Sequence, residues 1–292
     1  MVNTFSRLNP KHKPILTDRF NRELKTYYDD DLQALWMQWN PHPRPCYTLS
    51  LLKEIEELHD LLKQNNDCLY QDNICCPVRY LVASSKVPGV YNLGGDLEYF
   101  EQCIKAQDYD SLWQYGHAAM LAAYRTYTLP GIMAIALVQG HCLGGGFEAA
   151  LACHTLVAER SATFGFPEIK FNLFPGMGAY SFLERRVGHK LTNQLLCEGK
   201  IYSAEEMHAM GLIDVLVEDG EGVTAVENLI KQCRNYHSGL MAIAQVRRRV
   251  QRLDYEEMRD ILSVWVDAAL CLTPRDLKLM CRIVGRQYML KG

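Results

Sequence analysis

Apolar residues along the chain follow two different spacings, one typical of helices and one of buried strands. A helical spacing of four, three and four positions links Leu51, Ile55, Leu58 and Leu62. These side chains share one face of a predicted helix that ends at Asn65-Asn66. Unspaced apolar runs of the kind found in buried strands occupy 78–83, 132–138 and 155–158. Buried strands that alternate with helices predict an α/β fold.

Beyond about residue 220 the pattern is helical only. An apolar stripe comprises Ile261, Trp265, Ala268 and Leu272. Thr273-Pro274 followed by Asp276 predicts a capped helix start, with proline at the first helical position. We therefore divide the chain into an N-terminal extension (1–45), a core (46–220) and a helical C-terminal segment (221–292).

Composition and charge argue against several classes of protein. Hydrophobic residues make up 48% of the 292 and charged residues 22%, as is ordinary for a globular protein. A net charge of -3 gives no reason to expect a nucleic-acid partner. The first twenty residues contain no apolar run of the signal-peptide kind, and no apolar stretch approaches the roughly 20 residues that span a bilayer. We expect a cytoplasmic protein without membrane insertion.

The 11 cysteines are scattered and form no CxxC pair. This usage predicts reduced thiols rather than a disulfide framework or a zinc site. Two neighbouring pairs, His141-Cys142 and Cys153-His154, suggest metal ligands, but adjacent residues in a strand point to opposite faces. Core packing explains both pairs better, and we expect no metal and no cofactor.

Chemistry concentrates around Gly144-Gly145-Gly146, which lies between a predicted buried strand and an apolar helix. Amide groups at a helix start have no intrahelical partner and can point at a developing negative charge. The Gly145 N–H is therefore a candidate oxyanion donor. A second donor is expected from the loop 93–96, where Gly95 is the candidate.

Two carboxyl groups complete this pattern, Glu148 directly after the glycines and Glu168 in a second glycine-bearing turn. Apolar neighbours tend to raise a carboxyl pKa toward the range useful for proton transfer. Each feature also has an ordinary explanation: the glycines make a tight turn, Glu148 interacts with a helix dipole, and Glu168 is a solvated surface residue. Their combination within one segment favours paired acid and base roles.

The segment 130–188 resembles the signature of the crotonase (enoyl-CoA hydratase/isomerase) superfamily. The motifs that carry the resemblance are Gln139-Gly140-His141-Cys142-Leu143-Gly144-Gly145-Gly146-Phe147-Glu148, Phe166-Pro167-Glu168 and Phe174-Pro175-Gly176-Met177-Gly178. The similarity extends over about 75–220. It implies a core built as a spiral of ββα turns, a homotrimer or a dimer of trimers, and a thioester polarised by the N–H groups of Gly95 and Gly145.

Gly95 in place of the usual alanine, the long N-terminal extension, and Phe147 and Phe166 beside the acids most resemble the diffusible-signal-factor synthases. That resemblance implies a dehydratase and thioesterase that converts a 3-hydroxyacyl chain on acyl carrier protein into a free cis-2-unsaturated fatty acid, a bacterial quorum-sensing signal. We assign the C2 proton to Glu168 and the departing hydroxyl to Glu148, and these roles are interchangeable. One of the two then activates water.

An apolar tunnel must hold the acyl chain. Its candidate lining residues are Phe147, Leu173, Met177 and Trp265, although core packing explains each equally well. The basic run Arg247, Arg248, Arg249 and Arg252 is either a docking surface for the carrier protein or a solvated helix face.

Two rival functions remain. An ordinary enoyl-CoA hydratase would run related chemistry on a CoA thioester. A non-catalytic regulator would bind an acyl ligand or a sensor kinase, which is also a possible partner of a synthase. A dinucleotide enzyme is disfavoured because Gly176-Met177-Gly178 lacks the third glycine of that fingerprint.

Overall fold

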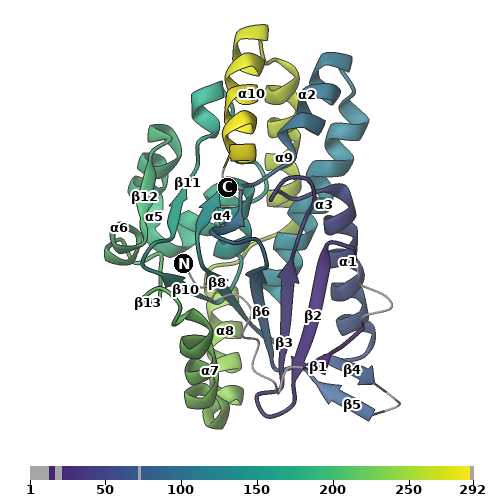
Figure 1. The fold of residues 1–292 in the computed structure, drawn as a ribbon, viewed down its shortest axis with the longest axis vertical. Helices are drawn as coiled ribbons and strands as arrows, with labels where there is room; N and C mark the ends of the chain where they lie inside the picture. Colours follow the sequence, from purple (N-terminus) through teal and green to yellow (C-terminus); the bar gives the residue numbers. More distant parts are fainter. Residues whose placement is uncertain (1–12, 17–21, 72–73, 290–292) are drawn as a thin grey trace.

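The computed structural model describes residues 13–16, 22–71 and 74–289. Its centre is a seven-stranded sheet, seen in Figure 1 beside α1. In spatial order its strands are β1 (Lys13–Pro14), β2 (Leu24–Asp29), β3 (Ala34–Trp39), β6 (Tyr80–Ser85), β8 (Met133–Val138), β10 (Thr155–Glu159) and β13 (Val215–Val217). The pairs β1–β2 and β2–β3 are antiparallel, and the pairs from β3 to β13 are parallel.

Two smaller sheets accompany the large one. The first has the order β12 (Ile201–Ser203), β11 (Thr163–Gly165), β9 (His141–Leu143) and β7 (Val90–Asn92). The second is a hairpin of β4 (Cys68–Gln71) and β5 (Ile74–Pro77). The chain thus passes repeatedly between a strand of the large sheet and a strand of the four-stranded sheet, and the predicted α/β class is confirmed.

Helices cover both faces of the large sheet. They are α1 (Leu49–Gln64), α2 (Leu97–Ala106), α3 (Tyr109–Thr128), α4 (Gly145–Leu151), the 3-10 turn η2 (Glu168–Phe171), α5 (Ala179–Glu198), α6 (Ala204–Ala209), α7 (Gly222–Cys233), the 3-10 turn η3 (Arg234–Tyr236), α8 (His237–Val250), α9 (Tyr255–Leu270) and α10 (Pro274–Met289). A core cluster on one face includes residues of α1, α3, α4 and α9. A second cluster joins the other face to α7 and to Met241 of α8. No described helix is long and apolar enough to cross a membrane.

The predicted helix after residue 50 is α1, and its apolar face is buried as expected. Thr48 caps it, since its hydroxyl accepts a hydrogen bond from Leu51 N at 3.0 Å. The helix stops at Asn65, as predicted. Of the range 1–45, residues 24–39 form β2 and β3, and β3 pairs with β6. This part of the predicted extension therefore belongs to the large sheet.

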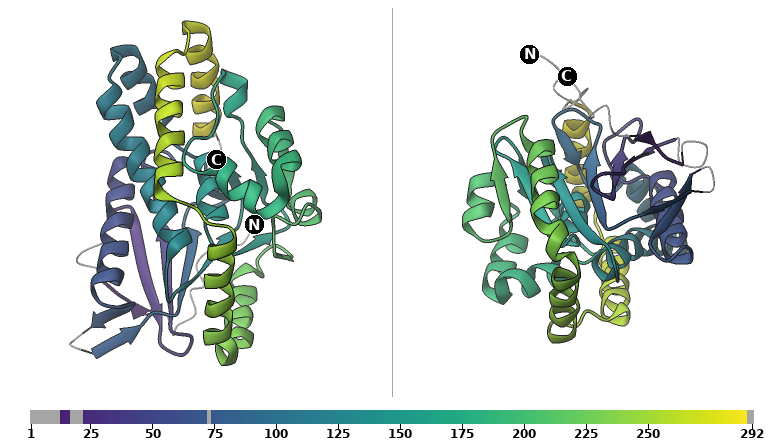
Figure 2. Two further views of the ribbon diagram at one scale, coloured as in Figure 1. Left: turned by 180° about the vertical axis from the view of Figure 1, so that it is seen from behind. Right: turned by 90° about the horizontal axis from the view of Figure 1, so that it is seen from below.

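The C-terminal part is helical from α7 onward, as predicted (Figure 2). The cap of α10 is also confirmed, because Thr273 N and Asp276 N each donate to the other residue's side chain, at 2.9 and 3.3 Å. The stripe on α9 is shifted by part of a turn. Leu262 is buried at 0% exposure, whereas Ile261 is only half-buried, because Leu262 packs against Gly116 of α3.

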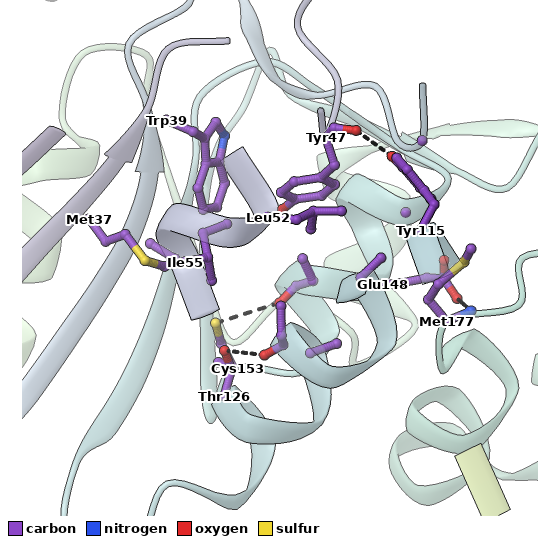
Figure 3. A pocket seen from close by; sticks show the side chains of 17 residues that line it. Met37, Trp39, Tyr47, Leu52, Ile55, Tyr115, Thr126, Glu148, Cys153 and Met177 are labelled. Carbon is purple, nitrogen blue, oxygen red and sulfur yellow. Dashed lines mark hydrogen bonds between the residues drawn. The ribbon is translucent and has the colours of Figure 1, made fainter. Parts of the chain in front are cut away.

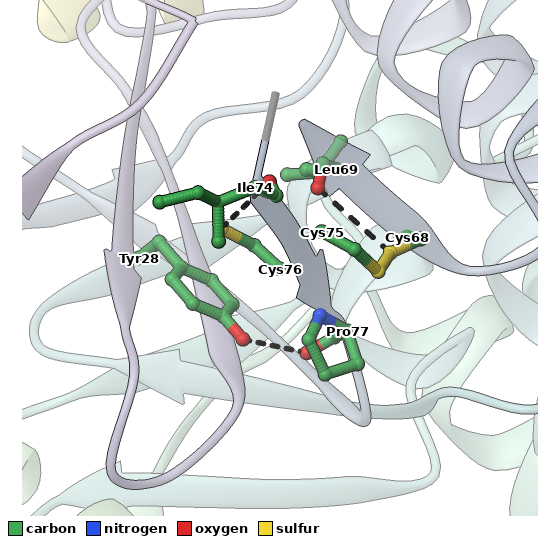
Figure 4. The surroundings of a disulfide bond; sticks show 7 residues. All are labelled: Tyr28, Cys68, Leu69, Ile74, Cys75, Cys76 and Pro77. Carbon is green, nitrogen blue, oxygen red and sulfur yellow. Dashed lines mark hydrogen bonds between the residues drawn. A yellow bond between two sulfur atoms is a disulfide. The ribbon is translucent and has the colours of Figure 1, made fainter. Parts of the chain in front are cut away.

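One cysteine prediction was wrong. Cys68 and Cys75 form a disulfide across the β4–β5 hairpin (Figure 4). Their Cα atoms lie 6.1 Å apart because Cys75 pairs with Tyr70 and thus faces Cys68 diagonally. Sequence spacing did not reveal the pair, since nothing in it places the two residues on neighbouring strands. The other described cysteines form no disulfide.

Candidate active site

The three glycines form the start of α4, directly after β9. Gly144 has a φ of 52°, and a Cβ there would collide with the Oε1 atom of Glu168. A Cβ at Gly146 would collide with the backbone oxygen of Asn92. Only glycine fits either position, so the segment brings the backbone of α4 close to both the β7 loop and Glu168.

Two backbone loops meet at this point. The position of a Cβ at Gly145 lies 3.4 Å from the Gly94 Cα and 3.6 Å from the Gly95 nitrogen. Within the part of the chain that the structure describes, the N–H groups of Gly95 and Gly145 donate to no residue. Both glycines line one cavity. The two predicted oxyanion donors are therefore adjacent and available to a ligand oxygen.

The loop that carries Gly95 is held by residues that the sequence did not single out. The Tyr115 hydroxyl accepts from Asp96 N at 3.0 Å and donates to the backbone oxygen of Tyr47. The buried Arg44 forms ion pairs with Asp96 and Glu98. These contacts fix the peptide units on the C-terminal side of Gly95. A buried tyrosine and a paired arginine far apart in sequence give no local signal of such a role.

Glu148 lies in the first turn of α4 and is 1% exposed. Its Oε1 atom accepts hydrogen bonds from Met177 N at 2.8 Å and Ala179 N at 2.9 Å. Burial raises the pKa of this carboxyl to about 7, and the two N–H donors act in the opposite direction by stabilising the carboxylate. Its second oxygen, Oε2, lies 3.7 Å from the Cβ position of Gly145.

Glu168 begins the turn η2, after β11. Its Oε2 atom is buried and has no hydrogen-bond partner in the described residues. Burial raises the pKa of this carboxyl to about 8, and the nearby charge of Glu148 adds to the effect. Two buried acids that repel each other's charge keep at least one proton between them near neutral pH.

The cavity at this site is mostly apolar and measures about 630 Å³, including space open to solvent (Figure 3). Its lining residues are Met37, Trp39, Tyr47, Leu52, Ile55, Ala83, Gly95, Tyr115, Ala119, Ala122, Ala123, Thr126, Gly145, Glu148, Ala149, Cys153 and Met177. Glu148 and the amides of Gly95 and Gly145 lie at one end of the cavity. Mostly apolar side chains line the rest of it. This arrangement suits a ligand with one polar reacting group and an apolar chain.

The model of the family described as enoyl-CoA hydratase/isomerase matches residues 59–259. The chain belongs to this family. Members of the enoyl-CoA hydratase/isomerase family, the crotonase superfamily, are typically enzymes. Membership gives the chain an activity of the hydratase or isomerase kind.

Solved structures agree with this assignment. The enoyl-CoA hydratase of Bacillus halodurans has a TM-score of 0.73 at 25% identity, covering 89% of this chain and 100% of that chain. Human mitochondrial delta3-delta2-enoyl-CoA isomerase has a TM-score of 0.74 at 18% identity, covering 93% and 100%. DspI of Pseudomonas aeruginosa has a TM-score of 0.63 at 21% identity, covering 86% and 98%. The last two show the fold alone.

Of the four residues predicted to bind the acyl chain in this enoyl-CoA hydratase/isomerase fold, Met177 lines the cavity. The other three lie in the surrounding core. Phe147 packs against Phe166 with ring centroids 5.0 Å apart, and Leu173 N donates to the Glu168 backbone oxygen at 3.1 Å. Trp265 contacts Phe100 and fills the space beside Gly176. A direct acyl contact by these three stays a prediction.

The remaining polar candidates of this family member have separate places. His141 and His154 bond to Thr163 and Ala134 N at 2.7 and 3.0 Å, and no described cluster of His, Cys, Asp or Glu could hold a metal. Arg247 and Arg249 are exposed on α8. Arg248 donates to the backbone oxygen of Leu129 at 2.7 Å, so it also supports α3.

Proposed function

We propose that the protein removes water from a 3-hydroxyacyl thioester carried on acyl carrier protein and then hydrolyses the thioester to a free cis-2-enoic acid. One observation carries this proposal. Two carboxyls with raised pKa values, Glu148 and Glu168, flank the glycine segment whose amide, with that of Gly95, is free to bind the thioester oxygen. Acid, base and oxyanion donors are all that this chemistry needs.

The surroundings of the two acids support one division of roles in dehydration. Two N–H donors stabilise Glu148 as a carboxylate, so it takes the proton from C2. The electrons move onto the thioester oxygen, which the amides of Gly95 and Gly145 bind. Glu168, the acid with the higher pKa, protonates the 3-hydroxyl, which leaves as water while the C2–C3 double bond forms. This order exchanges the roles that the sequence suggested.

After dehydration Glu148 carries the proton and Glu168 is a carboxylate. Hydrolysis returns both residues to their starting protonation states. Glu168 is now a carboxylate and takes a proton from a water molecule as the water oxygen attacks the thioester carbon. The tetrahedral oxyanion forms on the same two amides. When the carbon–sulfur bond breaks, Glu148 returns its proton to the departing thiolate. The site is then ready for the next substrate without any external acid or base.

Assembly and carrier docking belong to the same proposal. Helix α8 exposes the apolar residues Ile243, Val246 and Val250, a stripe suited to contact with further copies of the chain in a trimer. The exposed Arg247 and Arg249 suit an acidic carrier protein. Light scattering tests the assembly. If α8 lies between copies, Arg247→Glu lowers the assembly state, whereas with a free α8 it only weakens carrier binding.

Product analysis tests the chemistry. Purified protein is incubated with 3-hydroxyacyl carrier protein and, separately, with enoyl-CoA, and the products are followed by mass spectrometry. We expect free cis-2-enoic acid from the carrier substrate, formed in the cytoplasm of the producing cell. An ordinary enoyl-CoA hydratase gives 3-hydroxyacyl-CoA and no free acid. A non-catalytic regulator gives neither product, and its biological output survives Glu148→Gln.

A further inference from the structure

The apolar cavity follows two helices that run in the same direction. At the catalytic end, the Tyr115 hydroxyl of α3 donates to the backbone oxygen of Tyr47, just before α1. At the far end, His59 of α1 lies beside Thr126 of α3, with 3.2 Å between Nε2 and Oγ1. Figure 3 shows Tyr47 and Tyr115 at one end of the cavity and Thr126 and Cys153 at the other. From Tyr115 to Thr126 the helix rises about 16 Å, which suits a medium-length acyl chain.

Small side chains make the room between these ends. The cavity is lined by Ala119, Ala122 and Ala123 of α3 and by Ala149 of α4. Larger apolar side chains at these positions would fill the space. An acyl chain that starts at the two oxyanion amides would pass along these alanines. Its methyl end would then meet Thr126.

A second cavity begins directly behind Thr126. It measures about 1160 Å³, including space open to solvent, and lies between the C-terminal turns of α1 and α3, with His59, Lys63 and Arg125 among its lining residues. Successive turns of α1 divide between the two spaces, since Ile55 lines the first and His59 the second. The contact between His59 and Thr126 is thus a partition between the apolar cavity and a second one whose lining includes charged side chains.

The partition is well defined. His59 is 3% exposed and Thr126 is 7% exposed. The Thr126 hydroxyl donates to the Ala122 backbone oxygen at 2.9 Å, so its oxygen accepts the N–H of His59. Burial and the charge of Arg125 lower the pKa of His59 to about 4, so the ring is neutral at physiological pH. Its Nδ1 atom has no partner within the described residues.

We propose that the hydrogen-bonded pair His59 and Thr126 is the end wall of the acyl cavity and sets the longest acyl chain that the protein accepts. The inference rests on the acyl-thioester function proposed above and adds the residues that fix substrate length. Removal of the imidazole joins the two cavities, and longer chains then gain room. A larger side chain among the alanines moves the limit the other way.

Calorimetric binding of saturated straight-chain acyl thioesters, on CoA and on carrier protein, tests the wall without requiring turnover. In the unmodified chain we expect affinity to rise about fourfold per methylene until the chain fills the cavity, and then to fall sharply. His59→Ala moves this break to longer chains, and Ala123→Leu moves it to shorter ones. Lys63→Ala, which changes only the second cavity, leaves it in place.

Three results would overturn the wall: no break in the unmodified chain, no thioester binding on either carrier, or an unchanged break in both folded variants. Far-ultraviolet circular dichroism establishes that each variant is folded, and Ala123→Leu gives an independent answer if His59→Ala is not. Failure of the proposed function looks different. Thioesters then bind with a break that the variants move, while 3-hydroxyacyl carrier protein yields no free acid.

Discussion

Glu148 and Glu168 carry the same type of side chain in two different surroundings. Glu148 lies in the first turn of α4, and two backbone N–H groups donate to one of its oxygens. Glu168 begins a short turn, and its buried Oε2 receives no hydrogen bond from the described residues. Burial raises both pKa values, while two backbone N–H donors favour the charged form of Glu148 and one favours that of Glu168. This difference underlies the proposed roles, with Glu148 as the base and Glu168 as the acid.

The strongest test of this difference replaces each acid by glutamine. Glu148→Gln keeps an oxygen that can accept from Met177 N and Ala179 N, so the fold is preserved while proton transfer is lost. We expect each variant to lose about 10²–10⁴-fold in the rate of dehydration, measured by single-turnover formation of the enoyl product. If both variants retained near-normal rates, neither carboxyl would be catalytic.

Hydrolysis then separates the two acids. When the enoyl thioester is supplied directly, Glu168 has to start as the base, so Glu168→Gln loses hydrolysis by about 10²–10⁴-fold. Glu148 serves only the departing thiolate, a good leaving group that needs little help. Glu148→Gln therefore retains more hydrolysis than Glu168→Gln, as measured by free-acid release. The opposite order would return the roles to those suggested by the sequence.

The pH profile of dehydration sharpens the same comparison. The reactive form has one carboxylate and one acid, so the rate rises as Glu148 ionises near pH 7 and falls as Glu168 loses its proton near pH 8. The two limbs belong to the pair rather than to either residue. Rates measured across pH 5 to about 10 should therefore give a bell, with about a tenfold change per unit on each limb. A flat profile would contradict proton transfer as the limiting step.

Thermal stability should show the cost of burying Glu168. Its folded pKa of about 8 lies above the ordinary value of 4.5, so the folded state binds a proton that the unfolded state lacks between these values. The associated stability is complete below about pH 4.5 and is lost as pH rises through about 8. Glu168→Gln should therefore raise Tm by about 2–4 °C at alkaline pH relative to its effect at pH 5 or so. An equal shift at both pH values would show that the carboxyl titrates normally.

The smallest effect concerns Tyr115, which supports the oxyanion loop and is hydrogen-bonded to neither acid. Tyr115→Phe removes the hydroxyl that joins Asp96 N to the Tyr47 oxygen and leaves the ring in place. A lost hydrogen bond of this kind is worth about 1 kcal/mol, so kcat should fall about fivefold with little change in KM or in the pH limbs. A shifted pH profile would show that Tyr115 acts on the acids rather than on the oxyanion loop.

Local sequence was enough to predict the parts of the site that are themselves local. Gly145 and Glu148 are three residues apart in one helix start, and the buried strand before them is readable from its apolar run. The spacing of Leu51 and Ile55 likewise predicted α1. Glycine spacing also pointed to Gly95, because a glycine-bearing loop after a buried strand is a recognisable pattern.

The remaining features depend on contacts between distant segments. Whether Phe147 or Ala123 faces a cavity depends on which helix packs opposite, and an apolar residue reads the same in either case. The support from Tyr115 and the disulfide of Cys68 require knowledge of strand and helix neighbours. A cavity is also defined by what is missing, so the alanines that create it carry no positive signal in the sequence.

The cavity wall has a bearing on how new specificities arise in this family. The family model begins at residue 59, yet the cavity is also lined by Met37 and Trp39 of β3 and Ile55 of α1. The reacting groups therefore lie in the shared part of the chain, whereas part of the cavity lining comes from the segment that precedes it. Substitutions in that segment can therefore change the shape of the cavity while Gly145, Glu148 and Glu168 stay the same.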